Sequence, residues 1–489
     1  MDSFLPALSP STQFFVRTAY GVLLLLTLGQ ALPSARRFFL SDRWGGYAKS
    51  SADVDAIQNP FVMPVLLAVW VLAGVAIVFG WATPWPALVN LVLCRYFFVH
   101  MRWKGILRGM GAPGFLAYWA GFAVFLLEYT SHYAPQLRSL ALLVVQVDLG
   151  FIMLSAGIYK FTAGYPRNHG MELGMANPMW GYWWRRYIRM PPDHIVFWIL
   201  NQLAWGTEVV AAVMMLIPPT RQLGGLLLSG SFVFILTQIR LGFLCEMVVV
   251  AGLLYVVPGT LVDKWIAAIA PASFISDAAA GGGFAIVNTV LRGALIGYLV
   301  LLPLAHAGLY YNFYGRRTLP KPIQRFLERY TNLFGMIIWR VFSVDVVNFF
   351  IRVQAEPRAG GERTLIGRLD KWPRFNHVGE MICLTSLFTT LKYYPSNDAL
   401  FRERLMRYAR TIPRPPSSVV VFEYVSVVKR ATHFDWVEVA EYRVDVEAGT
   451  VTERLLDESF SPRAAHAVSP VHAGSTPGSY APAGQTGRA

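Results

Sequence analysis

Cysteine and charged residues are both scarce in this chain. It has 3 cysteines in 489 residues, and Cys94, Cys245 and Cys383 are far apart with no CxxC pair. This spacing excludes a disulfide framework and gives no indication of a zinc site. Charged residues make up 15% of the chain, whereas hydrophobic residues make up 55%. Such a composition excludes the ordinary soluble classes and is typical of proteins that cross a membrane several times.

The N-terminus also lacks the features of a cleavable signal, so we expect the first apolar segment to remain as an anchor. Runs of about 20 apolar residues are long enough to cross the hydrocarbon core of a bilayer. The apolar runs of this chain predict an all-α polytopic membrane bundle over residues 13–311, with about nine spanning or re-entrant helices. These segments are 13–32, 61–83, 86–100, 115–130, 137–160, 195–217, 222–238, 241–257 and 285–311.

Positive charge is distributed unevenly over the connections between these segments. Nine segments with the N-terminus outside place every basic connection, and the chain after residue 315, on the inner side, as the positive-inside rule requires. Contact with anionic lipid explains the net charge of +14, and we expect the lipid bilayer and no nucleic acid as a partner. The basic residues are Arg36, Arg37, Arg43, Lys49, Arg102, Lys104, Arg108, Arg185, Arg186 and Arg189.

Three further regions follow the bundle. Residues 315–342 mix basic and apolar side chains in a pattern that favours an interfacial amphipathic helix. Residues 344–458 predict a small α+β soluble domain, and residues 459–489, rich in Ser, Pro, Ala and Gly, are expected to be disordered. Within the α+β domain we expect strands at 347–354, 419–428 and 436–446, a turn at 447–450 before another short strand, and helices at 378–392 and 397–410.

Lys160 closes the long apolar run 137–160. A lysine near bilayer depth costs roughly 2.5–3.5 kcal/mol on insertion scales, so it is usually kept where it forms a pair or does chemistry. Asp148 lies twelve residues earlier, about 120° around the helix, and does not face it. We therefore expect a partner from another helix, first Glu208, with Asn201 on the same face. The alternative is that Lys160 only extends its amine to the interface.

Four acidic residues lie inside apolar runs, and each needs a partner or a proton. They are Glu128, Asp148, Glu208 and Glu246. Besides a role in chemistry, these acids can hold the bundle together by pairing with Arg95, Arg138 or Arg240.

The stretch Gly150-Phe-Ile-Met-Leu-Ser-Ala-Gly-Ile-Tyr-Lys-Phe161, followed by Gly164 and Gly170-Met-Glu172, carries a family resemblance. It resembles the segment around the catalytic lysine of vitamin K-dependent gamma-glutamyl carboxylases, in which a membrane helix ends Ala-Gly-(apolar)-Lys-Lys-Leu. Lys160 matches the catalytic lysine and Tyr159 replaces its neighbour. The following loop departs from the family pattern. The resemblance covers roughly residues 13–310, the membrane unit called the HTTM domain.

The resemblance implies an integral membrane enzyme, multi-pass and in the inner membrane if the source is bacterial. In that family the lysine deprotonates a quinol, and O2 and CO2 are used to carboxylate a glutamate. It implies a menaquinol or vitamin K-like quinol here, and a peptide or lipid-soluble substrate. Lys160, His100 and Glu208 are the candidate catalytic residues, since His100 precedes the lysine by about the family's separation. Burial suits a lysine base because it disfavours the ammonium form.

Tyr159, His169, Trp180 and Trp184 are the candidate residues for binding the quinone head group. The aromatic and basic stretch 180–187 is otherwise the interfacial belt of a membrane protein. His169 and Glu172 can share a helix face, but a metal site would need more ligands, so no metal is expected. The alternative function is a non-enzymatic membrane component of peptide maturation, export or immunity on the same scaffold. The family's large domain after the membrane unit is replaced here by about 115 residues.

Overall fold

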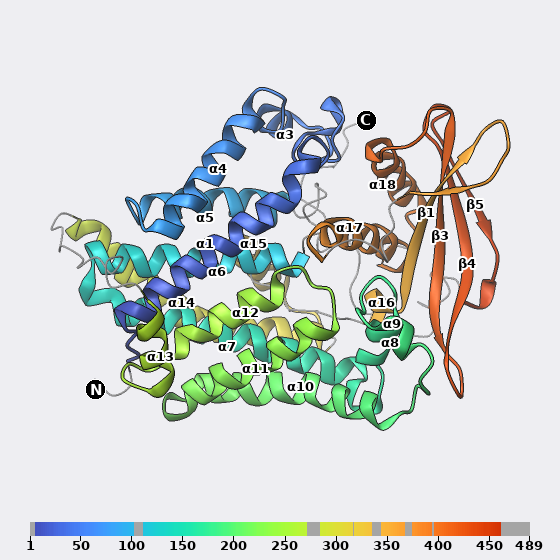
Figure 1. The fold of residues 1–489 in the computed structure, drawn as a ribbon. Helices are drawn as coiled ribbons and strands as arrows, with labels where there is room; N and C mark the ends of the chain where they lie inside the picture. Colours follow the sequence, from blue (N-terminus) through green and yellow to red (C-terminus); the bar gives the residue numbers. More distant parts are fainter. Residues whose placement is uncertain are drawn as a thin grey trace.

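The computed structural model describes residues 5–101, 111–270, 284–315, 317–334, 344–366, 374–393 and 396–460. A helical bundle occupies the first two thirds of the chain, and an antiparallel sheet with two helices follows it (Figure 1). The tail expected to be disordered lies outside the described residues apart from its first two. The basic positions Arg102, Lys104 and Arg108 also lie outside them.

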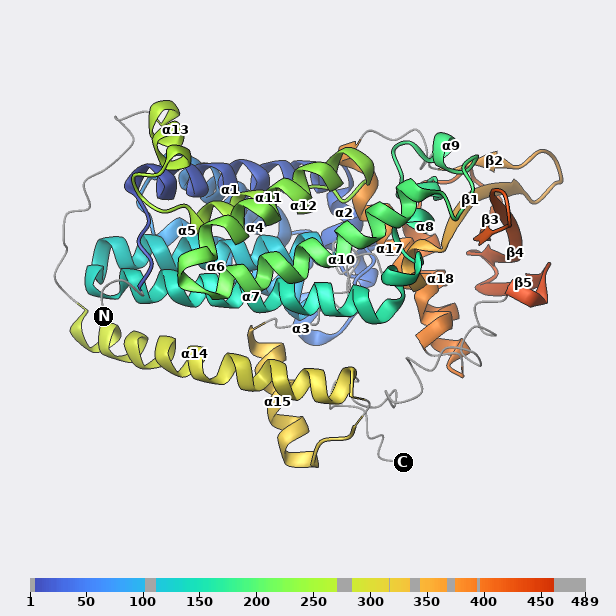
Figure 2. The same ribbon diagram turned by 90° about the horizontal axis from the view of Figure 1, so that it is seen from below.

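Each of the nine predicted segments overlaps a helix, although 61–83 and 241–257 extend beyond the helices Val62–Phe79 and Leu244–Gly252. The long axes of these helices run roughly side by side, and the chain alternates between the two ends of the bundle (Figure 2). The described helices up to the sheet are α1 (Pro10–Ala31), α2 (Ala35–Phe39), α3 (Ala52–Ile57), α4 (Val62–Phe79), α5 (Trp85–Cys94) with a π-helical turn (Arg95–His100), α6 (Gly111–Tyr133), α7 (Arg138–Ala163), α8 (Met171–Ala176), α9 (Trp184–Tyr187), α10 (Ile195–Leu216), α11 (Arg221–Gln238), α12 (Leu244–Gly252), α13 (Leu261–Ile269), α14 (Ala285–Phe313) and α15 (Lys321–Phe334).

Five stretches of helix in the described part of the chain are long and apolar enough to cross a membrane, by length and composition. They are Pro10–Phe39, Val62–Phe79, Pro135–Ala163, Ile195–Leu216 and Ala285–Phe313. The predicted count of nine spans is therefore not confirmed. Helices α5 and α12, with 10 and 9 residues, are too short to cross a bilayer alone. The interfacial helix expected over 315–342 is described as α15, up to Phe334.

Glycine sets the distance between α7 and α10. A Cβ added at Gly157 would lie 2.6 Å from Val209 Cγ2 and 2.9 Å from the Val209 backbone nitrogen. One added at Gly150, seven residues earlier, would lie 2.8 Å from Leu216 Cδ2. Small residues at this spacing let two helix backbones approach closely, as they do inside membranes. The side chains that flank Gly157 on both helices are therefore brought together.

The C-terminal domain is a five-stranded antiparallel sheet in the order β2-β1-β3-β4-β5. Alternation of apolar and polar residues explains the strands: one face packs against the helices and the other faces outward. Phe388 and Phe401 from the helices contact Tyr442 on the inner face. The elements are α16 (Val344–Val347), β1 (Phe349–Pro357), β2 (Thr364–Leu365), α17 (Arg374–Tyr393), α18 (Asp398–Thr411), β3 (Ser418–Lys429), β4 (Phe434–Asp445) and β5 (Thr450–Leu455).

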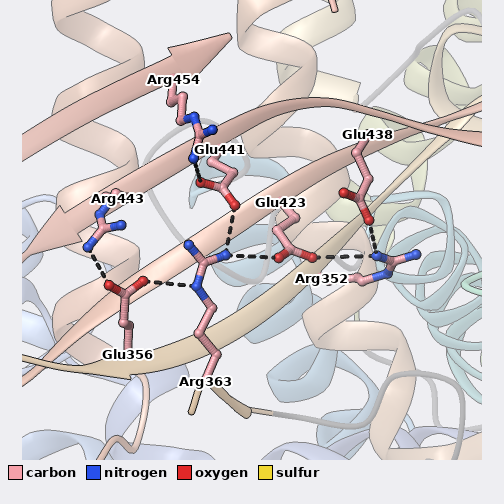
Figure 3. Close-up of polar contacts among 8 residues, drawn as sticks. All are labelled: Arg352, Glu356, Arg363, Glu423, Glu438, Glu441, Arg443 and Arg454. Atoms are coloured by element: carbon pink, nitrogen blue, oxygen red, sulfur yellow. Dashed lines mark hydrogen bonds and ion pairs between the residues drawn. The ribbon is translucent and has the colours of Figure 1, made fainter. Parts of the chain in front are cut away.

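The outer face of this sheet carries a network of arginine and glutamate side chains (Figure 3). Arg352, Glu423 and Glu441 stand opposite one another on three neighbouring strands. Arg363 reaches Glu441 at 2.7 Å, Glu356 at 2.9 Å and Glu423 at 3.3 Å. Cross-strand pairs of opposite charge stabilise the register of the sheet.

The C-terminal domain packs onto the end of the bundle where the first basic connection lies. Arg37 Nε donates to Thr411 Oγ1 at 3.0 Å, and Lys49 pairs with Glu403 at 2.8 Å. The Tyr408 ring packs edge-on against Tyr47. One hydrophobic core runs from the bundle into the sheet. The domain and the basic connection 32–61 therefore share one end of the molecule, and α13 lies at the other (Figure 2).

Candidate functional site

Lys160 and Glu208 form a buried pair between α7 and α10. The distance from Lys160 Nζ to Glu208 Oε1 is 2.5 Å, and each side chain is 2% exposed. The sequence-based expectation that Glu208 is the partner of Lys160 is confirmed. Gly157, one helical turn before Lys160, allows the close approach of the two helices that this contact needs.

Only one of the two oxygens of the Glu208 carboxyl has a hydrogen-bond partner among the described residues. Among the described residues, Glu208 Oε2 is buried without a hydrogen-bond partner. Buried carboxylate oxygens are normally hydrogen-bonded, and an unsatisfied one in a native structure often marks a site that handles protons. Oε1 is the carboxyl oxygen that contacts Lys160, and Oε2 is a second acceptor position on the same carboxyl.

A second buried carboxylate lies two helical turns away along α10. Glu172 of α8 is fully buried, and it pairs with Lys429 at the end of β3. Its oxygens accept hydrogen bonds from the Gly170 backbone N–H at 2.9 Å and from Asn201 Nδ2 at 2.7 Å. Lys429 Nζ also donates to the Asn168 carbonyl at 2.7 Å. This carboxylate is fully satisfied, and its countercharge comes from the C-terminal domain.

Asn201 serves this second pair. Its Nδ2 donates to Glu172, and its Oδ1 accepts from the Met171 N–H at 2.9 Å. The expectation that Asn201 partners Lys160 was wrong, because seven residues separate Asn201 from Glu208 along α10, about 10 Å at the α-helical rise. The same helix face therefore carries one member of each buried site.

Tyr165 is close enough to both buried carboxylates for each of them to affect its hydroxyl. Its side chain is fully buried, and a Cβ at Gly170 would come within 2.4 Å of its ring. Burial raises the pKa of the Tyr165 hydroxyl well above its ordinary value, and the carboxylates of Glu172 and Glu208 and the Tyr159 hydroxyl raise it further. Tyr165 therefore remains a neutral hydroxyl beside the two buried sites. Apart from its place in the loop after Lys160, no sequence pattern marks Tyr165 as a site residue.

The ring contacts of the candidate cofactor residues Tyr159 and Trp184 are with different neighbours. Tyr159 faces Phe313 of α14, with ring centroids 6.3 Å apart. Trp184 packs on Trp436 of β4 at 4.9 Å. Trp180 is buried, whereas His169 is exposed. The quinone site at these four residues therefore stays a prediction.

His100 and His169 are not placed as expected. His100 is half-exposed, lies 4.0 Å from Asp53 through Nε2, and stacks on Tyr96. These contacts lie among α3 and α5, and Glu208 is the only polar partner that the structure gives Lys160 within the described residues. His169 cannot share a helix face with Glu172 because α8 begins at Met171. No group of three or more metal-ligating side chains lies together in the part of the chain that is described.

The other acidic residues inside the bundle have structural partners. Asp148 accepts a hydrogen bond from Trp119 Nε1 at 2.9 Å. Glu128 pairs with Arg17 at 3.5 Å. Of the expected arginine partners, Arg138 donates to the Gln13 side chain and Arg240 donates to the Pro178 carbonyl. These contacts connect helices, and Asp148 Oδ1, like Glu208 Oε2, is buried without a hydrogen-bond partner among the described residues. Glu208 differs from these acids because it forms an ion pair in which both side chains are only 2% exposed.

No family model, curated protein or solved structure matches this chain. The functional argument therefore rests on the geometry of the two buried pairs.

Proposed function

We propose that this chain is an integral membrane enzyme in which Lys160 is the general base and Glu208 its proton partner. The observation that carries the proposal is the 2.5 Å contact between the two side chains, each 2% exposed, in a helix that is long and apolar enough to span a membrane. An ionisable group at such a position is a functional candidate by default.

The pair can supply a base without help from water. Transfer of the shared proton from Lys160 to Glu208 leaves a neutral amine beside a neutral carboxylic acid, and a low-dielectric site disfavours the separated charges. The amine can then accept a proton from a bound substrate. The unsatisfied Oε2 of Glu208 gives the displaced proton a second position on the carboxyl. General-base catalysis of this kind contributes about 10²–10⁴-fold to a rate.

The reaction class that we propose is that of the gamma-carboxylases, on the resemblance around Lys160. That class uses a quinol, O2 and CO2. The ring contacts of Tyr159 and Trp184 are with Phe313 and Trp436, so we assign no residue to the quinol and no step through it. The substrate within this proposal is a peptide or a lipid-soluble compound.

A second candidate is a non-enzymatic membrane component of peptide maturation, export or immunity. The closed contact of Lys160 with Glu208 favours it, because a paired lysine can simply hold α7 against α10. Both candidates retain the same fold, and they differ in what Lys160 must do.

Substitution of Lys160 separates the two. Lys160→Ala abolishes activity, and Lys160→Arg also fails, because arginine keeps the charge and the pairing with Glu208 but cannot give up its proton. The assay is incorporation of labelled CO2 into peptide or lipid by membranes supplied with reduced menaquinone, together with peptide maturation in cells, at matched membrane levels. Full activity in Lys160→Arg would end the base assignment and leave the scaffold role.

A further inference from the structure

The end of the bundle beside Lys160 is closed by the C-terminal domain. Every residue from 170 to 181, in the segment where the bundle meets the C-terminal domain, is buried. Asn177 Nδ2 donates to the carbonyls of Val347 and Phe349 at 2.8 Å each, and Glu172 pairs with Lys429. The ring of Phe434 packs edge-on against Phe197 of α10. A water-soluble molecule approaching from this end meets packed protein before it reaches Lys160.

The flank of the α7–α10 contact is covered by two aromatic rings. Phe161 follows Lys160 and is 53% exposed, and its ring packs edge-on against Trp205 with centroids 5.1 Å apart. Trp205 lies one turn before Glu208 and is fixed by a hydrogen bond from Nε1 to Gln202 at 2.9 Å. Leu203, next to this pair along α10, is half-exposed and apolar. This flank presents a surface suited to lipid.

We propose that substrate reaches Lys160 and Glu208 from the bilayer, past a gate formed by Phe161 and Trp205, while the C-terminal domain closes the site to water. This inference rests on the proposed function and narrows its substrate to a lipid-soluble compound with a proton that an amine can remove. A peptide is disfavoured, because its backbone N–H and C=O groups would lie unsatisfied in hydrocarbon along this route.

Two isothiocyanates test the route without knowledge of the substrate. Phenyl isothiocyanate is lipid-soluble, and its 4-sulfonated form is confined to water. Each adds to a neutral amine to give a thiourea. With the protein in lipid nanodiscs, mass spectrometry gives the rate at Lys160 and at Lys49 and Lys264, which are exposed at opposite ends of the bundle. We expect the lipid-soluble reagent to modify Lys160 about tenfold faster or more than the sulfonated one, since charge is poorly tolerated in hydrocarbon. The other two lysines should react with both.

Four variants extend the test. Phe161→Ala should speed the lipid-soluble reagent at Lys160 and leave the sulfonated one slow, whereas Trp198→Ala, which removes an exposed ring from the same helix α10 away from the gate, should change neither. Lys429→Ala, which loosens the C-terminal domain, should admit the sulfonated reagent. Glu208→Gln removes the carboxylate that pairs with Lys160 and should raise the rate of Lys160 with the lipid-soluble reagent.

Equal rates of both reagents at Lys160 in the wild type would overturn the route, since they would show access from water. So would the absence of modification by phenyl isothiocyanate in both the wild type and Glu208→Gln. These outcomes are independent of the base assignment. Lys160 can be reached from lipid and still prove dispensable when replaced by arginine, in which case the gate stands and the proposed enzyme does not.

Discussion

Lys429 is the single residue of the C-terminal domain that neutralises a fully buried carboxylate of the bundle among the described contacts. Lys429→Met should destabilise the protein by roughly 3–5 kcal/mol, toward the low end because Lys429 is 27% exposed. The loss arises from the uncompensated charge left on Glu172. Thermal unfolding in nanodiscs measures it, and amide hydrogen exchange in β3 and β4 should rise with it.

The matched control is the double variant Lys429→Met with Glu172→Gln. Glutamine keeps an oxygen to accept from the Gly170 N–H and carries no charge, so most of the lost stability should return. If the double variant is as unstable as the sum of the two single variants, the pair contributes no coupling and the docking depends on the apolar contacts alone.

At the residue scale, the free-energy cost of a charged side chain inside the membrane was enough to predict the partner of Lys160. Lys160 needed a partner from another helix, and the few acids in apolar runs left Glu208 as the first choice, which the contact confirms. Lys429 gave no such signal, because a lysine at the end of a strand is ordinary until the fold brings it against Glu172. His100 was chosen by its separation from Lys160 along the chain, and sequence separation says little about distance in a helical bundle.

The contact between helices α7 and α10 depends on Gly157. Gly157→Ala should destabilise the protein by about 1–3 kcal/mol, because the new Cβ meets the Val209 backbone nitrogen at 2.9 Å, which cannot move without α10. The shift also separates Lys160 from Glu208, so activity should fall by more than stability alone explains. Unfolding and activity assays at matched protein levels measure the two effects.

Gly206→Ala is the comparison for this variant. A Cβ at Gly206 meets nothing within 4 Å, so the change should be neutral or stabilise α10 by up to about 1 kcal/mol. Equal losses in both variants would mean that glycine is needed for helix flexibility and that close approach is not the reason.

The ion-pair network on the sheet gives a pH dependence. The hydrogen bond from Arg363 lowers the pKa of Glu441 below its ordinary 4.5, so this group stabilises the fold above that pH and contributes less as the pH falls below it. Burial raises the pKa of Glu423, whose contribution has the opposite sign. In Arg363→Ala the deficit in unfolding midpoint should therefore be largest near neutral pH and shrink below about pH 4.5.

Arg454→Ala provides the control for this dependence. Arg454 is 70% exposed and lies 3.9 Å from Glu441, so its removal should change the midpoint little at any pH. A deficit in Arg363→Ala that stays constant from neutral to acid pH would rule out Glu441 as its source. High salt should reduce the deficit, since the network is partly exposed.

Elements were predictable where a pattern repeats. Alternation over 436–446 predicted β4, found at Phe434–Asp445, and the strand expected at 419–428 is β3, found at Ser418–Lys429. Strand β2 has two residues, too few for any alternation to show. Each of the nine predicted apolar runs overlaps a helix. Hydropathy does not reveal whether a helix of 9 or 10 residues, such as α12 or α5, crosses a membrane or ends inside the bundle.

In the whole molecule, the C-terminal domain lies at the end of the bundle that carries the basic connections. Arg37 and Lys49 contact α18, and Trp184, next to Arg185, packs on Trp436. Because basic connections remain on the cytoplasmic side, we expect residues 344–460 to face the cytoplasm. Helix α13, at the other end of the bundle, should face the opposite side (Figure 2).

Cysteine accessibility in sealed vesicles tests this orientation. Single cysteines at Arg185, Lys264 and Arg430 occupy exposed positions, and the native cysteines are buried, so labelling at the new sites is distinguishable. A charged, impermeant maleimide should reach positions 185 and 430 from the cytoplasmic side and position 264 only from the other. Labelling of 185 and 430 from opposite sides would contradict the structure itself. Labelling of both positions from the outside would agree with the structure but reverse its orientation in the membrane. The end of the bundle that carries the C-terminal domain would then face away from the cytoplasm, contrary to the positive-inside rule.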